Sequence, residues 1–132
     1  MKALKIVALI ASAAAVAPGA FAQSADYSGK WLFSGLILSG KAALSFAQVC
    51  DITQTGSQFA GLCKGPNGGC SAVGVVSGGG LDLTCQMTNL SNPSLTGVLT
   101  FHGVTAPDAV IRGAVVHSKA PGASGQAAMM RL

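Results

Sequence analysis

The clearest pattern of apolar and polar residues lies between Val49 and Cys63. Apolar or small residues alternate there with polar ones, and Gly56-Ser57 separates the two halves. A period of two is typical of a β-strand with one buried face. Gly-Ser is a favoured hairpin turn, because glycine supplies the positive φ that the first position of a type II′ turn requires. The pattern therefore predicts a hairpin of two strands, 43–55 and 58–64.

Cys50 and Cys63 each lie six residues from this turn, so the predicted register places them opposite each other. Hydrogen-bonded and non-hydrogen-bonded pairs alternate along an antiparallel ladder, and this pair falls in the closer, non-hydrogen-bonded class. Opposed cysteines of that kind suit a cross-strand disulfide. The other two cysteines, Cys70 and Cys85, flank a second turn at 77–80 and would form the second bond. The rival pairing, Cys63–Cys70 with Cys50–Cys85, stays open.

Strand-like runs punctuated by turn residues recur along the rest of the chain. They predict eight strands, at about 29–38, 43–55, 58–64, 71–77, 80–88, 94–103, 109–118 and 125–132. No connection is long enough for a crossover helix, so neighbouring strands should be antiparallel. We therefore expect an all-β fold, an eight-stranded antiparallel up-and-down barrel with two disulfides. Closure removes exposed sheet edges, which favours a barrel over an open sandwich.

The same alternation assigns the faces of the strands. On the hairpin, the predicted inward residues are Phe46, Cys50, Ile52, Phe59, Gly61 and Cys63, with Gln48 and Gln54 also inward or at a barrel end. On the later strands they are Leu95, Leu99, Phe101, Ile111, Val115 and His117, whereas His102 points outward. Inward glycines at 61, 97, 103 and 113 fit a strongly curved sheet.

Residues 1–22 have the layout of a secretory signal peptide. Lys2 and Lys5 precede an apolar run over 6–16, and Ala20-Phe21-Ala22 is a small-x-small cleavage sequence. A retained membrane anchor is the alternative, but the run is short for a span and no stop-transfer segment follows. We expect residues 23–132 to form a single secreted or periplasmic domain that is free of the membrane after cleavage. An exported domain also favours oxidised cysteines.

The remaining composition excludes several classes of function. Residues 23–132 carry six Lys or Arg and four Asp, a net charge of +2, and the chain has no Glu. No basic cluster indicates nucleic-acid binding. The two histidines are predicted to point in opposite directions, the four aspartates are scattered, and no Gly-x-Ser-x-Gly elbow occurs. The cysteines lack zinc-site spacing. We expect no catalytic residues, no metal and no cofactor.

Gly29-Lys30-Trp31 opens the first predicted strand. A Gly-x-Trp at that place in an eight-stranded barrel resembles the calycin group, which includes lipocalins and avidins. In those proteins the tryptophan closes one barrel end, often beneath a basic residue from a late strand. The resemblance implies that Trp31 closes a barrel end here, with Arg131 as the basic residue. Biotin binding is not implied, because avidin sites use several tryptophans and Trp31 stands alone in this chain.

The segment Ser28-Gly29-Lys30-Trp31 and the later Cys50-Asp51-Ile52 also resemble the periplasmic metalloprotease inhibitors of Gram-negative bacteria. That family has a Ser-Gly-x-Trp strand, a Cys-Asp-Ile strand and one disulfide. Cys70 and Cys85 are additional here, and the second half of the chain matches less well. An exported bacterial family distinct from both groups is the alternative. In the inhibitors the N-terminal tail blocks the protease, and the corresponding tail here is 23–26.

Two binding functions follow as hypotheses. The first is a non-enzymatic barrel that holds a small apolar or amphipathic molecule, with possible contacts at Gln48, Gln54, Phe46, Phe59, Phe101 and His117. The second is a protease inhibitor, or another protein-binding barrel, that acts through its N-terminal tail. An interior filled by side chains would count against the first.

Overall fold

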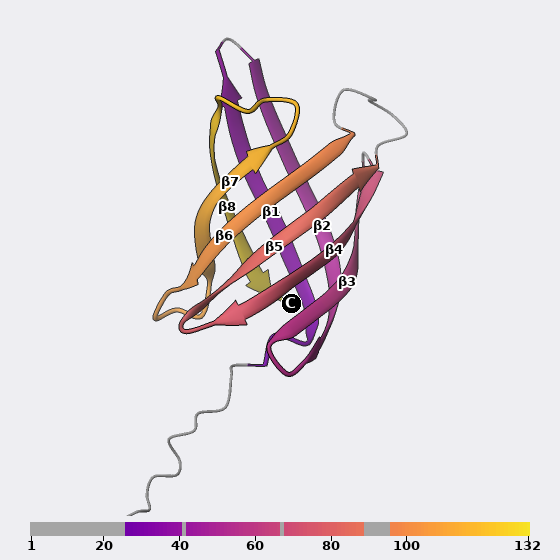
Figure 1. Cartoon of the computed structure of the whole chain (residues 1–132), viewed down its shortest axis with the longest axis vertical. Coiled ribbons are helices and arrows are strands. Elements are labelled where there is room, and N and C mark those ends of the chain that lie inside the picture. Colours follow the sequence, from indigo (N-terminus) through magenta and orange to yellow (C-terminus); the bar gives the residue numbers. More distant parts are fainter. Residues whose placement is uncertain (1–25, 41, 67, 89–95) are drawn as a thin grey trace, which may run out of the picture.

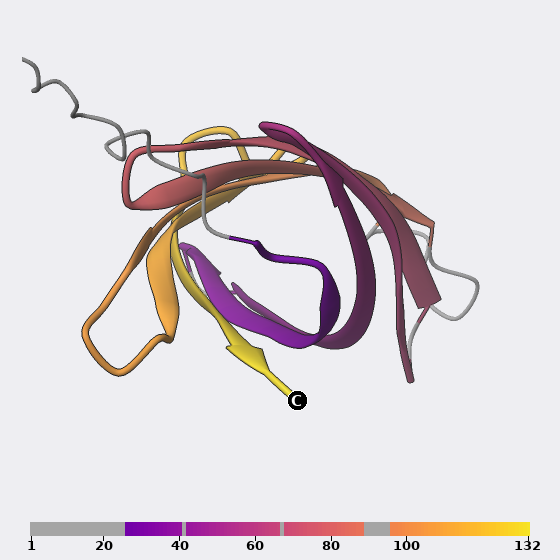
Figure 2. The same ribbon diagram turned by 90° about the horizontal axis from the view of Figure 1, so that it is seen from below.

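The structure is a computed structural model that describes residues 26–40, 42–66, 68–88 and 96–132. These residues form a closed barrel in which each strand pairs antiparallel with the next and β8 pairs with β1 (Figure 1 and, seen from below, Figure 2). The strands are β1 (Gly29–Ser39), β2 (Ala42–Thr55), β3 (Gln58–Gly65), β4 (Gly68–Ser77), β5 (Gly80–Thr88), β6 (Gly97–Thr105), β7 (Ile111–His117) and β8 (Ser124–Arg131). The predicted all-β, eight-stranded up-and-down barrel is confirmed.

The predicted hairpin register is also confirmed. Thr55 faces Gln58 across the turn, Cys50 faces Cys63, and Gly56 has the expected positive φ of 65°. Positive φ is a conformation that glycine adopts at no steric cost. The turn therefore sets the register of β2 and β3, and the register sets which residues face inward.

The start of two strands differs from the prediction by three residues, and the other boundaries differ by two residues or fewer. The segment 65–69 was expected to be a loop, but Gly65 faces Gly68, so the connection is a tight turn and β4 begins at Gly68 rather than at 71. Consecutive glycines can continue a β-ladder as well as interrupt it, because glycine adopts the extended conformation of a strand as readily as the positive-φ conformation of a turn. β6 begins at Gly97 rather than at 94, and the predicted inward Leu95 lies outside the described residues.

The barrel has two ends, which we call the base and the rim. The base carries Asp26–Ser28 and the last residues of β2, β4, β6 and β8, whereas β1, β3, β5 and β7 end at the rim (Figure 1). The predicted signal peptide at 1–22 and most of the predicted tail lie outside the described residues. In the part of the chain that the structure does describe, no helix is long and apolar enough to cross a membrane.

Side chains fill the middle of the barrel. Phe33 is fully buried, and its ring centroid lies 5.0 Å from that of Phe46 and 5.2 Å from that of Phe101. The large inward rings lie over glycines of neighbouring strands, Phe46 over Gly35 and Phe59 over Gly74, where a β-carbon would overlap the ring. The other fully buried apolar side chains of this layer include Ile37, Leu83, Leu99, Ile111, Val115 and Met129. This arrangement is the packed interior expected of a small barrel. It counts against a ligand held in the middle of the barrel, so a small molecule would have to bind nearer an end.

Candidate functional site

The base of the barrel is closed by Trp31 and Arg131. The Arg131 guanidinium carbon lies 4.4 Å from the centre of the buried Trp31 ring, a cation–π contact. The same guanidinium donates to the carbonyls of Ser28 and Asp26, each at 2.8 Å. Trp31 Nε1 donates to the Tyr27 carbonyl at 2.8 Å. The pair therefore fixes the chain where it enters the first strand, in the arrangement that the calycin resemblance implies.

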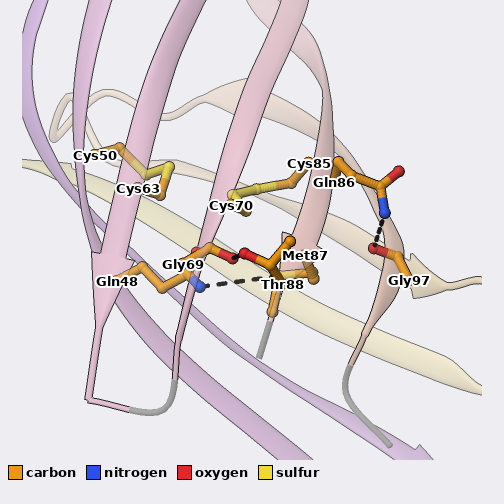
Figure 3. The surroundings of a disulfide bond; sticks show 10 residues. All are labelled: Gln48, Cys50, Cys63, Gly69, Cys70, Cys85, Gln86, Met87, Thr88 and Gly97. Carbon is orange, nitrogen blue, oxygen red and sulfur yellow. Dashed lines mark hydrogen bonds between the residues drawn. A yellow bond between two sulfur atoms is a disulfide. The ribbon is translucent and has the colours of Figure 1, made fainter. Parts of the chain in front are cut away.

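Above the base lie the four cysteines, all inward and all at most 5% exposed. The bonds are Cys50–Cys63 and Cys70–Cys85, so the pairing preferred from the sequence is confirmed and the rival pairing is wrong. The Sγ atoms of Cys63, Cys70 and Cys85 all lie within 4.8 Å of one another. Figure 3 shows the two disulfides side by side in one layer of the interior, which we call the sulfur layer. Oxidised sulfurs in this number indicate an oxidising, extracellular or periplasmic environment.

Gln48 lies beside the sulfur layer on its rim side (Figure 3). Its side chain is 5% exposed, and its Nε2 donates only a long hydrogen bond, 3.9 Å, to the Met87 sulfur. Gln48 Oε1 is buried, and no residue that the structure describes donates a hydrogen bond to it. Exchanging the amide oxygen and nitrogen would move the unpartnered atom without giving it a partner. A buried carbonyl in this position is a place where a ligand could donate a hydrogen bond.

His117 is the second buried polar side chain near the rim, at 2% exposed. Its Nδ1 accepts the Lys119 backbone N–H at 3.1 Å, which places the proton of a neutral imidazole on Nε2. A β-carbon on Gly97 would come within 2.9 Å of His117 Cε1, so the absence of a side chain at Gly97 makes room for the ring. Gly97 in turn faces Met87 across β5 and β6. Gln48, Met87, Gly97 and His117 therefore form a continuous group, the rim cluster.

Among the other predicted contact residues, Phe46 lies next to the rim cluster, two residues before Gln48 on the same face of β2, whereas Gln54, Phe59 and Phe101 lie elsewhere. Gln54 is near the base, where its Oε1 accepts the Tyr27 N–H at 2.7 Å and its Nε2 donates to the Gly56 carbonyl at 2.9 Å. Phe59 is near the base as well, and Phe46 and Phe101 contact Phe33 in the filled middle. The structure therefore brings Gln48 and His117 to one end and separates them from Gln54 and Phe59. The sequence analysis did not select Met87, although it lies two residues after Cys85 and so shares its inward face.

A single row of opposed inward residues connects the base to the rim. Reading around the barrel by register, the row runs Arg131, Trp31, Cys50, Cys63, Cys70, Met87, Gly97. Strands of a small barrel tilt against its axis, so a row that begins at one end reaches the other. The basal closure, three of the four cysteines of the sulfur layer and part of the rim cluster are therefore consecutive members of one row.

The outer face carries exposed pairs of polar and charged side chains. Lys30 pairs with Asp51 at 3.2 Å, His102 with Asp82, and Arg112 with Asp108 at 2.9 Å. Two hydrogen bonds from the Arg112 guanidinium, with a third from a backbone N–H, hold the pKa of the Asp108 carboxyl below its usual value. The backbone N–H of Ser28 similarly lowers the pKa of Asp26. Surface pairs of this kind contribute little to stability.

A shallow groove runs over the outer face of β2, β3 and β4. It is lined by Thr53, Thr55, Gln58, Phe59, Ala60, Val73, Gly74 and Val75, and none of these side chains titrates. A second groove, over β1, β7 and β8, includes Arg112, which is already paired with Asp108. Neither groove combines a nucleophile with a base. In both cases the lining could contribute apolar contact and little specificity.

No protein-family model matches the chain, and no curated protein matches it.

Proposed function

We propose that this protein is an exported, non-enzymatic binding barrel that holds a small amphipathic molecule at its rim. The observation that carries the proposal is Gln48 Oε1, a buried acceptor to which none of the described residues donates a hydrogen bond. Leaving a buried acceptor unsatisfied costs about 1–3 kcal/mol, and a ligand that donates one hydrogen bond to it recovers part of that cost. The structure supports a ligand with an apolar body and one donor group.

The apolar part of the ligand would be held by the half-buried side chains of Leu44 and Phe46 and by the Met87 thioether. Methionine adapts its shape easily and makes favourable contacts with aromatic rings. The fully buried Phe33 and Phe101 beneath this region limit the depth to which a ligand can enter. The proposed ligand is therefore a small one, comparable to a bicyclic aromatic molecule and smaller than a retinoid or a fatty acid.

The test uses indole and 1-methylindole as matched probes. Both have the same apolar ring system, but only indole has an N–H that can donate to Gln48 Oε1. In ¹H–¹⁵N correlation spectra, indole should shift the backbone resonances of Gln48, Met87 and Gly97, and should bind at least about tenfold more tightly than 1-methylindole, the factor that one hydrogen bond of about 1.4 kcal/mol supplies. Gln48→Met should remove the difference between the probes.

The same experiment can overturn the proposal. Equal binding of both probes, or shifts confined to the outer groove over β2–β4, would show that Gln48 does not recognise a donor. A native mass spectrum of the protein from its own compartment adds an independent measurement. A bound small molecule that is lost in Gln48→Met supports the proposal, and a bare chain together with no response to indole contradicts it.

A second candidate, a protein-binding barrel that acts through residues 23–26, is favoured by a different observation. Arg131 holds the carbonyls of Asp26 and Ser28, and the Asp26 carboxylate accepts the Ser28 N–H at 2.9 Å. The segment that follows the proposed tail is therefore fixed at the base. Inhibition of exported metalloproteases that is lost on deleting 23–25 and weakened by Arg131→Met would support it. An intact chain that inhibits none of them would exclude this use.

A further inference from the structure

The sulfur layer offers chemistry that the proposed function does not use. Cys63 is bonded to Cys50, yet its Sγ lies within 4.8 Å of the sulfurs of both Cys70 and Cys85 (Figure 3). Cys63 and Cys70 are also directly opposed in the register of β3 and β4. Opposed residues of an antiparallel pair have Cα separations of about 4.5–5.5 Å, which lie within the range that a disulfide can span. A Cys63–Cys70 bond is therefore compatible with this backbone.

We propose that the sulfur layer is an internal thiol–disulfide exchange site with Cys63 as its pivot. When the Cys70–Cys85 bond is opened by an external dithiol or phosphine, the Cys70 thiolate attacks the Sγ of Cys63. The Cys63–Cys70 bond forms, the Cys50–Cys63 bond breaks, and the negative charge moves from Cys70 to the Cys50 sulfur, where a proton from solvent can neutralise it. The number of disulfides is unchanged in this step. Exchange of this kind proceeds by direct attack of a thiolate on a disulfide sulfur.

Exchange would transfer the free thiol from one part of the barrel to another. In the fully oxidised protein the bonds join β2 to β3 and β4 to β5. After the step the bond joins β3 to β4, and the free Cys50 thiol faces Trp31 at the base. Reduction of the Cys70–Cys85 disulfide would thus produce a free thiol next to the basal closure. During oxidative folding the same route would convert Cys63–Cys70, which closes the shortest loop, into the native pair.

Burial decides the conditions under which exchange can occur. All four cysteines are at most 5% exposed, and Cys70 is the most exposed of them. Buried thiols in apolar surroundings hold their protons more tightly, so attack by an outside reagent is slow. The internal attack needs no reagent to enter, because the attacking and attacked sulfurs already occupy one layer. A single free thiol introduced by mutation should therefore start the exchange without any reductant.

Cys85→Ser is the first test, because it leaves Cys70 as the free thiol beside an intact Cys50–Cys63 bond. The folded variant is held at pH 8.5 without oxygen, quenched in acid and alkylated. Combined cleavage after Lys or Arg and before Asp places the four cysteine positions on separate peptides, 42–50, 51–64, 65–81 and 82–107. We expect a tenth or more of the chains to contain Cys63–Cys70 with Cys50 alkylated, which corresponds to isomers within about 1.4 kcal/mol of each other.

Cys50→Ser gives an independent measurement, because it frees Cys63 itself. The remaining bond should then be found both as Cys70–Cys85 and as a bond from Cys63 to Cys70 or Cys85. The control is the double variant Cys70→Ser with Cys85→Ser, in which Cys50–Cys63 should stay intact and no cysteine should be alkylated. If alkylation is confined to Cys70 in the first variant and to Cys63 in the second, the proposal is wrong. If neither variant folds, wild-type protein treated with half an equivalent of a phosphine is mapped in the same way. A Cys63–Cys70 bond with Cys50 and Cys85 alkylated supports the proposal, and a map that contains only the two native bonds contradicts it.

Discussion

Replacement of Gln48 by methionine should stabilise the ligand-free protein, which is unusual for the substitution of a buried residue. The side chains are similar in length and volume, so Gln48→Met leaves no cavity of consequence beside Met87. It removes a buried carbonyl that has no hydrogen-bond partner and an amide nitrogen whose only partner is a sulfur at 3.9 Å. A substituted apolar group of the same shape needs no partner.

The magnitude follows from the two opposing contributions. Removal of the unsatisfied carbonyl should stabilise by about 1–3 kcal/mol. Imperfect packing of a volume-conserving substitution usually costs less than about 1.5 kcal/mol. The net expectation is a gain of about 1 kcal/mol in the free energy of unfolding, which for a domain of this size corresponds to a rise in Tm of roughly 4–8 °C. Urea unfolding should show a higher midpoint with an unchanged slope, since the surface exposed on unfolding is the same.

Gln54→Met is the matched control, because it makes the same chemical change on the same strand and the same face. Both ends of the Gln54 amide have partners, the Tyr27 N–H and the Gly56 carbonyl. Loss of these bonds should lower stability by about 1–2 kcal/mol. The two variants should therefore have effects of opposite sign. A fall in Tm for Gln48→Met as large as that for Gln54→Met would refute the reasoning, because it would mean that Oε1 has a hydrogen-bond partner in the ligand-free protein.

Three further outcomes are expected. Arg131→Met should lower the free energy of unfolding, measured in urea, by roughly 1–3 kcal/mol, because the cation–π contact and two carbonyl hydrogen bonds are lost. Arg112→Met on the surface should change this free energy little. Similar effects of the two substitutions would mean that the basal closure does not stabilise the fold. The pKa of Asp108 in the folded protein lies below its ordinary value of 3.8, so its stabilising contribution is complete above pH 3.8 and is lost as pH falls through the folded pKa. Asp108→Asn should therefore reduce the decline of the urea midpoint below about pH 4. Parallel curves of urea midpoint against pH for the wild type and the variant would contradict this. Gly113→Ala should lower the free energy of unfolding by roughly 1–3 kcal/mol or more, because the new β-carbon would overlap a backbone carbonyl of β6. Gly122→Ala is the control, because its β-carbon meets open space and Tm should not change. An unchanged Tm for Gly113→Ala would contradict the close approach of β6 and β7.

Much of the barrel could be predicted because its information is local. Once the turn is placed at Gly56, counting residues outward along the two strands places Cys50 opposite Cys63. The period of two then extends the assignment of faces along each strand, which is how Gln48 and His117 were placed inside. The second disulfide was less determined, because Cys70 and Cys85 are not opposed: Ala72 faces Cys85, and Cys70 faces Met87. Diagonal pairs depend on sheet twist, which a residue count does not contain.

The grouping of the site residues could not be predicted from the strands one at a time. Gln48 and Gln54 share a strand and a face, yet one reaches Met87 near the rim and the other reaches Tyr27 at the base. Their partners come from distant segments, and the distance along a strand decides which segment each one meets. Strand assignment gives the direction of a side chain, whereas barrel closure and stagger determine its neighbours.

The row from Arg131 to Gly97 joins three features that would otherwise be described separately. Arg131 and Trp31 hold the first strand at the base, the cysteines link β2 to β3 and β4 to β5, and Met87 supports Gln48 near the rim. Disulfides that close loops of this size each stabilise a small domain by about 3 kcal/mol. The covalent links therefore lie between a fixed end and an end with an unsatisfied acceptor. A barrel that is held by covalent links below and carries an unsatisfied acceptor above could bind a ligand at its rim without losing its strand register, and for this physical reason we propose that recognition occurs at Gln48.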